Sequence, residues 1–315
     1  MAMTLAEAAL VTTNPRLPAV VGALNVSQIM NRTPFEEIAG RAFSYNSEAT
    51  LPAAAFRAVN AGYTESTGTF NDATESLVIL GGDYVVDRYL EQTSTGTVAS
   101  LIAAQRDMKA RSVAAKFGDS FINGDTAVDA NSFNGLKKRL TGAQVISSGA
   151  NGAAMNTDAA TRTAFLDRLD ALLGLVPGAD AIYANAQVIA ILRTVYRNTT
   201  INNYTVDELT GRPVEVPTWQ GVPVFDAGKK ADQTAIIPQT ETQGTSVNAS
   251  SIYAVNFADS EFSEGVLGIT NGGLQVDAPI QLETKPSWLG RIEFYTGLAL
   301  MGATPAARLS GVLAS

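Results

Sequence analysis

The groups of residues that could perform chemistry are short, and each departs from the pattern that its chemistry requires. Gly228-Lys229-Lys230 superficially resembles the end of a phosphate-binding loop, but Pro223 stands where that loop needs its first glycine and Lys230 where it needs Ser or Thr. Lys137-Lys138-Arg139 is too short for a localisation signal or a patch that binds polyanions. We therefore predict a turn with solvated lysines at the first site and the start of a surface helix at the second.

The acidic groups are equally incomplete. Residues 125–134 contain the Asp and Asn oxygens of a calcium loop, but Phe133 occupies a position that must supply an oxygen ligand. Asp259, Glu261 and Glu264 could form a carboxylate pair for acid–base catalysis, yet their spacing does not establish the separation that such catalysis needs. We predict a capped turn in the first case and exposed acids in the second, with no catalytic residue, cofactor or metal.

Composition removes further classes of function. The 315 residues include no Cys and no His, so disulfides, thiolate nucleophiles, Ser-His-Asp triads and the usual Cys/His zinc sites are impossible for this chain alone. Twenty-two basic and thirty acidic residues give a net charge of −8, which is not the basic excess of a dedicated nucleic-acid binder. An apolar content of 46% predicts a folded chain, and no export signal or membrane span is expected.

The elements that position these residues begin with an arm and a long hairpin. We expect a short helix near residues 4–10, an apolar helix from Pro18 to Met30, and a helical turn at Thr33-Pro34-Phe35-Glu36, which has the spacing of a capping box. Short strands are expected at residues 43–45, 51–59, 77–80 and 84–89. Because residues 61–74 are rich in Gly, Thr, Ser and Asn, the hairpin has few apolar side chains to bury at its end and needs a partner.

A long helix follows the hairpin. Thr95 to Asn123 has no Pro and repeats apolar residues every seven positions, which predicts a helix about 40 Å long. Asn123-Gly124 should end it in the left-handed conformation of a C-terminal cap. Its basic residues indicate a solvated or salt-bridged face or, alternatively, a contact with nucleic acid: Arg106, Lys109, Arg111 and Lys116.

The second half of the chain indicates a compact α/β lobe. Asp158 should cap an amphipathic helix that ends before Pro177-Gly178, residues 181–184 should form a buried strand, and Asn185 should cap a second helix. Further elements are expected in this order: a surface loop over 199–211, a hairpin around 219–221, a strand at 251–257, and strands from 274 to 300 that return to the long helix.

The order of these elements resembles that of the major capsid proteins of tailed bacteriophages, which have the Hong Kong 97-type fold. Four stretches strengthen the resemblance: Phe121-Ile-Asn-Gly-Asp125, Asn131-Ser-Phe-Asn-Gly-Leu136, Ile182-Tyr-Ala-Asn185 and Trp219-Gln-Gly-Val-Pro-Val224. None is a strict signature, so the resemblance rests on their order and spacing over nearly the whole chain. It implies an α+β protein, not an enzyme, that self-assembles as pentamers and hexamers into the icosahedral shell around a phage genome.

The resemblance also implies a division of the chain. Residues 1–35 would be an N-terminal arm, residues 36–82 an extended loop that lies on a neighbouring subunit, residues 83–145 and 266–315 a peripheral domain with the long spine helix, and residues 146–265 an α/β axial domain that meets its copies at the centres of pentamers and hexamers. Because aromatic residues and arginine are favoured anchors at interfaces, the residues expected to contact another subunit are Phe56, Arg57, Tyr63 and Phe70.

The same resemblance implies partners and a location. The protein would contact itself, a portal, scaffolding and decoration proteins where these are used, and packaged double-stranded DNA through weak non-specific contacts, with no membrane. It would assemble in the cytoplasm of a bacterial host and reside in the virion. Cross-linking members of the family use a Lys in the extended loop, whereas this chain has no Lys before Lys109, so no such isopeptide bond is expected. About 35 residues precede the hairpin, so a scaffold, if used, should be a separate protein.

Two other functions stay open on the sequence. An encapsulin, a bacterial nanocompartment of the same fold, holds cargo enzymes instead of DNA; the long arm and the lack of a recognisable cargo-docking feature favour the phage protein. A carboxylate-dependent enzyme, such as a glycosidase or a lyase, needs a concave pocket with two acids of shifted pKa, which nothing in the sequence demonstrates.

Overall fold

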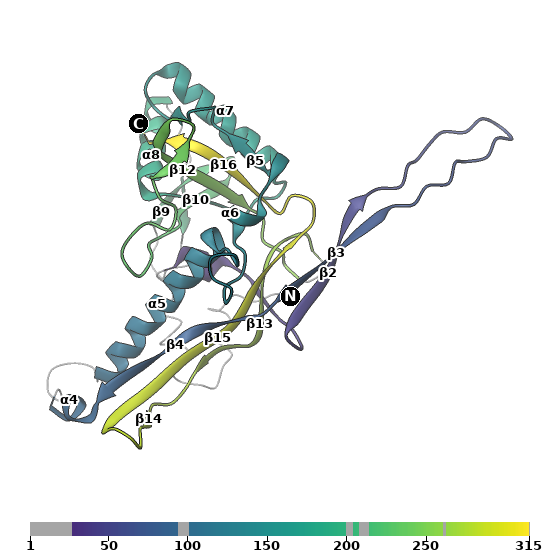
Figure 1. Ribbon diagram of the computed structural model, residues 1–315. Helices are drawn as coiled ribbons and strands as arrows, with labels where there is room; N and C mark the ends of the chain where they lie inside the picture. Colours follow the sequence, from purple (N-terminus) through teal and green to yellow (C-terminus); the bar gives the residue numbers. More distant parts are fainter. Residues whose placement is uncertain (1–26, 94–100, 200–203, 208–213, 261–262, 315) are drawn as a thin grey trace.

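The computed structural model describes residues 27–93, 101–199, 204–207, 214–260 and 263–314, so the helix expected near residues 4–10 and most of the helix expected before Met30 lie outside the described residues. It has a body with two β-sheets and a hairpin that projects from that body (Figure 1). The elements, in chain order, are α3 (Gln28–Arg32), β1 (Phe35–Glu37), β2 (Ala42–Thr50), β3 (Thr69–Ser76), β4 (Val78–Asp87), α4 (Arg88–Thr93), α5 (Leu101–Asn123), α6 (Leu136–Arg139), η1 (Gly142–Gln144), β5 (Val145–Ser147), β6 (Ala153–Ala154), α7 (Ala159–Leu175), β7 (Ala181–Ala184), α8 (Ala186–Thr199), β8 (Tyr204–Asp207), β9 (Val214–Trp219), β10 (Val222–Asp226), β11 (Glu241–Gln243), β12 (Ser246–Val255), β13 (Gly265–Val276), β14 (Ile280–Gln281), β15 (Ser287–Met301) and β16 (Ala306–Leu313). None of the described helices combines the length and the apolar composition needed to cross a bilayer.

The long helix α5 packs against a five-stranded sheet, as expected from the sequence. The central strand β15 pairs antiparallel with β13 on one side and with β4 on the other, and β1 runs parallel to β13. Phe117 of α5 is fully buried, and its ring centroid lies 5.6 Å from that of Phe35 and 6.4 Å from that of Phe294. Packed aromatic rings from three elements therefore join the helix to the sheet.

The helical turn predicted at residues 33–36 is wrong, because Phe35 to Glu37 form the strand β1. The Thr33 hydroxyl does not begin a helix but donates to the Ile29 carbonyl oxygen at 2.8 Å, at the end of α3. Phe35 lies opposite Gly268 of β13, where an added Cβ would be 2.5 Å from the Phe35 ring. Strand pairing and burial of this ring override the local capping pattern.

The long helix ends at Asn123-Gly124 as predicted, but the expected left-handed cap is wrong. Gly124 has no positive φ, and its N–H donates to the Ser120 carbonyl oxygen at 2.9 Å in a continuing helical bond. Glycine is required here by close approach of the backbone: an added Cβ would lie 2.3 Å from the carbonyl oxygen of Phe133.

The larger sheet has nine strands, in the order β5-β16-β12-β7-β10-β9-β8, with β11 on β12 and β6 on β16. Helices α7 and α8 form one core with alternate residues of its central strands, such as Ile182 of β7. The next residue, Tyr183, faces the other way, and its ring centroid lies 6.4 Å from that of Phe121 of α5. Strand alternation in β7 thus joins the core of this lobe to the core under the long helix.

The predicted caps of α7 and α8 are confirmed. The Asp158 carboxylate accepts from the Thr161 N–H at 2.7 Å, and the Thr161 hydroxyl accepts from the Asp158 N–H at 2.9 Å, which completes a capping box. The Asn185 side chain accepts from the Gln187 N–H at 2.8 Å. These residues fix where the helices begin, as their sequence positions predict.

Two strands of the larger sheet differ from the expectations. The surface loop predicted over 199–211 contains β8, which pairs antiparallel with β9, and its Tyr204 ring packs 6.2 Å from the ring of Tyr196. The last strand, β16, lies between β5 and β12 in the larger sheet, whereas the division implied by the resemblance groups residues 266–315 with the long helix. The apolar sequence of β16 is compatible with burial in either sheet, so tertiary packing decides which strands it pairs with.

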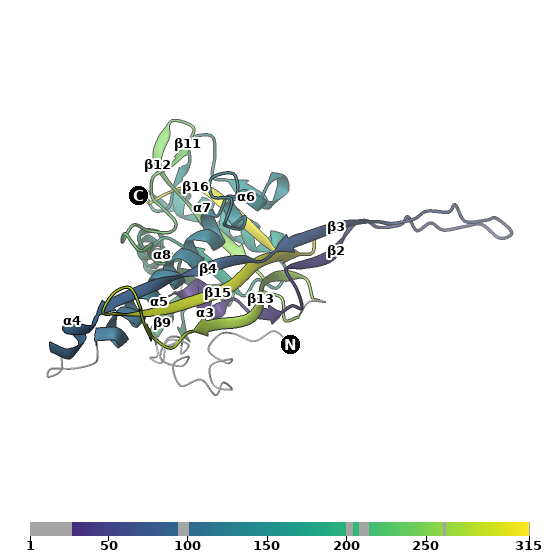
Figure 2. The same ribbon diagram turned by 60° about the horizontal axis from the view of Figure 1, so that its bottom comes forward.

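The hairpin β2–β3 forms a two-stranded sheet of its own and points away from the body (Figure 2). Its pairing ends at Thr50 opposite Thr69, whose hydroxyls lie 2.7 Å apart. The strand predicted over 51–59 is therefore wrong. Pro52 follows the last pair, and proline cannot donate a ladder hydrogen bond. We call residues 51–68, which connect the two paired strands, the extension.

Candidate assembly surface

The root of the hairpin, which we define as residues 43–45 of β2 and the paired residues 73–75 of β3, is anchored in the body by aromatic side chains. The rings of Phe43 and Tyr45 stack with centroids 5.8 Å apart and pack on a small core from β13 and β15 that includes Ile269 and Met301. The Tyr45 hydroxyl accepts from the Leu300 N–H at 3.4 Å. Burial raises the pKa of Tyr45, and the charge of a nearby carboxylate adds to the increase. The root of the hairpin is thus part of the folded body.

A bidentate ion pair beside these rings also holds the root. Arg139 of α6 donates to both carboxylate oxygens of Glu75 on β3, at 2.5 and 2.7 Å, and its Nε donates to the Asn134 carbonyl oxygen at 2.7 Å. The two side chains are largely buried, and paired donors of this kind fix direction as well as distance. The hairpin therefore leaves the body at a defined angle.

The extension, in contrast, has nothing to pack on in a single chain. Every residue from 51 to 67 is exposed, including Leu51, Val59 and the fully exposed Phe56. Apolar side chains gathered on a projecting segment mark an interaction surface. Its shape and composition fit a partner surface that can bury aromatic and aliphatic groups.

The four residues expected to contact another subunit all lie on this projection. Arg57 and Tyr63 lie together, with the guanidinium 5.4 Å from the ring centroid, and Arg57 also donates to the Ala61 carbonyl oxygen at 3.2 Å. Phe56 lies on the extension and Phe70 on β3, and both side chains are exposed. Whether they contact a second subunit stays a prediction.

A second exposed apolar surface was missed by the sequence reasoning. On β4, the side chains of Ile79 and Val85 face away from α5 and are 71% and 55% exposed, while the alternate residues Tyr84 and Val86 are buried. The signal that could have revealed it is the presence of apolar residues on both faces of this strand. Between them, Arg291 donates to both oxygens of Asp83 at 2.7 and 3.1 Å, and these hydrogen bonds lower the pKa of Asp83.

The other groups singled out in the sequence form no catalytic arrangement among the described residues. Residues 125–134 form a turn in which the Asn134 side chain accepts from the Thr126 N–H at 3.0 Å, as expected for a capped turn. Gly228 has a φ of +87° and begins the predicted turn, in which Lys229 is exposed as expected. The expectation of a solvated Lys230 is wrong, because its amine pairs with Asp119 of α5 at 3.1 Å. Asp259 and Glu264 are exposed, and Glu261 lies outside the described residues.

Comparison with known proteins adds one match to a family and several to solved structures. Residues 43–161 match the family Major capsid protein GP7. No curated protein sequence matches the chain.

Three solved structures cover most of the chain. The holo-SrpI encapsulin complex from Synechococcus elongatus PCC 7942 is 15% identical with a TM-score of 0.66, and the match covers 91% of this chain and 88% of that chain. The capsid of a native GTA particle is 13% identical with a TM-score of 0.60, covering 93% and 90%. A chain of the solved structure of Mycobacterium phage Adephagia is 13% identical with a TM-score of 0.57, and the match covers 94% of this chain and 89% of that chain. At these identities the likeness shows a shared fold.

Proposed function

We propose that this chain is a major capsid protein with the Hong Kong 97-type fold, and that it associates as pentamers and hexamers into a closed icosahedral shell that encloses a phage genome. The observation that carries the proposal is the extension, in which residues 51–67 are all exposed and Phe56 and Tyr63 lack a core. A projecting segment of this kind can be buried by the same surface patch on every neighbouring copy, as a closed symmetric assembly requires.

We propose a division of labour among four parts of the chain. Residues 1–35 act as an arm, and residues 38–77 act as the extended loop on a neighbouring subunit. Residues 83–145 with 266 to about 305 form the peripheral domain around α5, to which we add residues 36–37 and 78–82 because they pair with β13 and β15. Residues 146–265 form the axial domain. Because β16 pairs with β12 and β5, we add residues 306–313 to the axial domain.

We propose that the protein is a structural component of the virion. We propose that it assembles in the cytoplasm of a bacterial host, together with a portal and with separate scaffolding or decoration proteins where these are used. A net charge of −8 suits a container that need not hold its DNA tightly or read its sequence.

The test is negative-stain electron microscopy of the purified chain after size-exclusion chromatography. Closed shells, or rings of five and six, are the expected result. A double variant, Phe56→Ala with Tyr63→Ala, should stay below shell size, because it removes the exposed rings. The matched control, Val128→Ala with Val247→Ala, truncates exposed apolar residues on the body instead and should assemble normally. A wild-type chain that stays monomeric even with a scaffold added in trans would overturn the proposal.

Heated particles provide a second readout. Because no Lys precedes Lys109, we expect particles denatured by heat to run as monomers on a gel. Ladders of covalent oligomers would show that the subunits are cross-linked by another route.

An encapsulin-type nanocompartment is the second candidate, because a solved encapsulin shares the fold at a TM-score of 0.66. The contents of particles purified from the native source distinguish the two functions. A phage shell should contain double-stranded DNA, and a nanocompartment should contain a stoichiometric cargo protein.

A further inference from the structure

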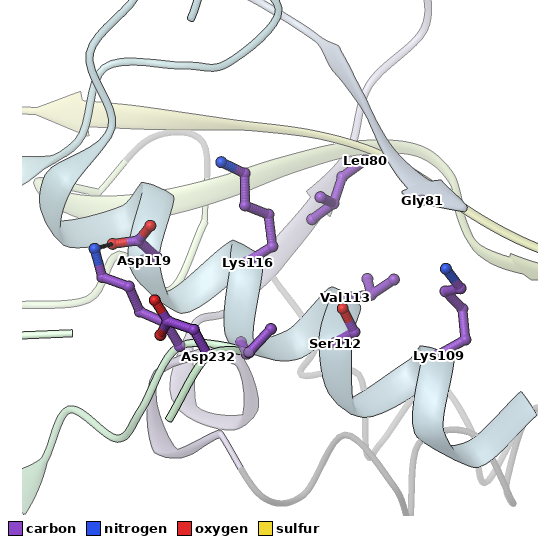
Figure 3. A pocket seen from close by; sticks show the side chains of 11 residues that line it. Leu80, Gly81, Lys109, Ser112, Val113, Lys116, Asp119 and Asp232 are labelled. Atoms are coloured by element: carbon purple, nitrogen blue, oxygen red, sulfur yellow. Dashed lines mark ion pairs between the residues drawn. The ribbon is translucent and has the colours of Figure 1, made fainter. Parts of the chain in front are cut away.

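A groove of about 360 Å³ lies between α5, β4 and the loop that follows β10. Three of the seven lysines of the chain line it: Lys109 and Lys116 of α5, and Lys230 of the loop. Figure 3 shows Lys109, Ser112 and Lys116 along one side of α5, beside Leu80 and Gly81 of β4. In a chain with a net charge of −8, this is a local concentration of positive charge.

Of the three lysines in the groove, one forms an ion pair with a carboxylate of the described residues and two do not. The Lys230 amine pairs with Asp119 at 3.1 Å. Asp232, also at the groove, accepts from the N–H and hydroxyl of Thr234. In the part of the chain that the structure describes, no carboxylate forms an ion pair with Lys109 or Lys116. Lys109 lies near Asp83, whose oxygens both accept from Arg291. The two amines on α5 are therefore available to an external anion.

The spacing and the chemistry of these groups fit phosphate oxygens. Lys109, Ser112 and Lys116 are separated by three and four residues, so they lie on one side of the helix, and about 10 Å of helix separates the two lysines. All three can donate hydrogen bonds. Among the described residues, no aromatic residue, Asn or Gln lines the groove, so the described lining has nothing that stacks on a base or reads its edge.

We propose that this groove contacts phosphate oxygens of the packaged double-stranded DNA, with Lys109 and Lys116 as the main donors, and that this side of α5 faces the interior of the shell. The inference rests on the proposed function. It deepens that function by assigning the weak, sequence-independent DNA contact to particular residues. Two unpaired lysines give a contact that salt weakens and that leaves the genome free to slide.

The test measures the affinity of the unassembled full chain for a short DNA duplex of random sequence. Binding is monitored by the fluorescence anisotropy of the labelled duplex at salt concentrations between about 50 and 200 mM. The variant is Lys109→Gln with Lys116→Gln, and the control, Lys138→Gln with Lys285→Gln, removes the same charge at two lysines outside the groove. We expect the first variant to bind about tenfold more weakly at low salt, with a salt slope shallower by about 1.8. The control should change affinity by about twofold at most.

Competition experiments identify the kind of anion that the groove binds. Polyglutamate should compete weakly with the duplex; competition as strong as that of unlabelled DNA would overturn the proposal in favour of an acidic protein segment. Inorganic phosphate that displaces the duplex at comparable concentration would overturn it in favour of a small-anion site. Equal DNA affinity in the two double variants would also overturn it.

Assembly separates this inference from the proposed function. The Lys109→Gln/Lys116→Gln chain should form the same particles as the wild type under the electron microscope, and those particles should retain less nucleic acid after nuclease treatment. If the variant forms normal particles that retain as much DNA as the wild type, the inference about the groove is overturned and the proposed function is not. If the wild-type chain forms no shells, the proposed function itself is overturned.

Discussion

The extension and the aromatic core under α5 contain similar side chains but place them in opposite surroundings. Phe117 is fully buried among Phe35, Phe121, Phe133 and Phe294, whereas Phe56 of the extension is fully exposed. The core residues lie on elements that run past one another, so each ring has neighbours. The extension leaves the body, so its rings have none. The difference shows that an apolar residue contributes to folding or to assembly according to what the fold brings near it.

Of the substitutions that test this difference, truncation of the buried Phe117 ring should have the largest effect on stability. Phe117→Ala should lower the free energy of unfolding by about 3–5 kcal/mol, because it removes a buried aromatic side chain and leaves a cavity between helix and sheet. Urea unfolding followed by circular dichroism measures the loss. An unchanged midpoint would show that the cluster does not support the body.

A charged cluster of the body should also depend on its surroundings. Glu241 accepts from Lys137 at 2.7 Å, from Arg308 at 3.1 Å and from Ser251. Despite the opposing effect of burial, these partners hold the pKa of Glu241 below its ordinary value of 4.5. Glu241→Gln should therefore lower the free energy of unfolding by about 1.5–3 kcal/mol at neutral pH, because Lys137 and Arg308 lose hydrogen bonds to a charged acceptor.

The pH dependence of this cluster follows from the direction of the shift. A carboxyl group whose pKa is lowered by folding stabilises the fold above its unfolded pKa, and that contribution disappears as the pH falls through the folded value. The stability difference between wild type and Glu241→Gln should thus be constant above about pH 5.5 and shrink below pH 4.5. Urea midpoints at several pH values measure it. A difference that grows on acidification would contradict the assignment.

The root of the hairpin lies between the two regions and should show an intermediate effect. Arg139→Gln removes the bidentate pair with Glu75 and should cost about 1–2 kcal/mol. Hydrogen exchange should quicken in β2 and β3 while α7 keeps its protection. Equal loss of protection in both places would mean that the root is not a separate unit.

The smallest effect on folding is expected in the extension itself. Phe56→Ala with Tyr63→Ala should change the free energy of unfolding of the unassembled chain by less than about 0.5 kcal/mol, because neither ring is buried there. A loss comparable to that of Phe117→Ala would break the comparison and place these rings in a core.

Local patterns predicted the elements whose partners are close in the chain. The apolar periodicity and the caps at Asp158 and Asn185 located α7 and α8, because a capping side chain bonds within its own first turn. The turn at Trp219-Gln220-Gly221 was equally predictable: Gln220 and Gly221 both have positive φ, as a tight hairpin turn requires.

Other features depended on residues far apart in the chain. The capping pattern at Thr33 gave way to β1 because Phe35 fits beside Gly268, more than two hundred positions away. The sequence also placed Phe56, Arg57, Tyr63 and Phe70 on the projection, whereas the groove beside Lys109 depends on the packing of the helix, the sheet and a distant loop.

The sequence by itself thus determined the order and type of most elements, the lack of Cys and His chemistry, and a hairpin with too little core of its own. Only the tertiary structure decided which sheet takes β16, that residues 51–68 form no strand, and which lysines share a groove. The reason is physical: caps and periodicity act over one or two turns of chain, while strand partners and grooves arise from packing between distant segments.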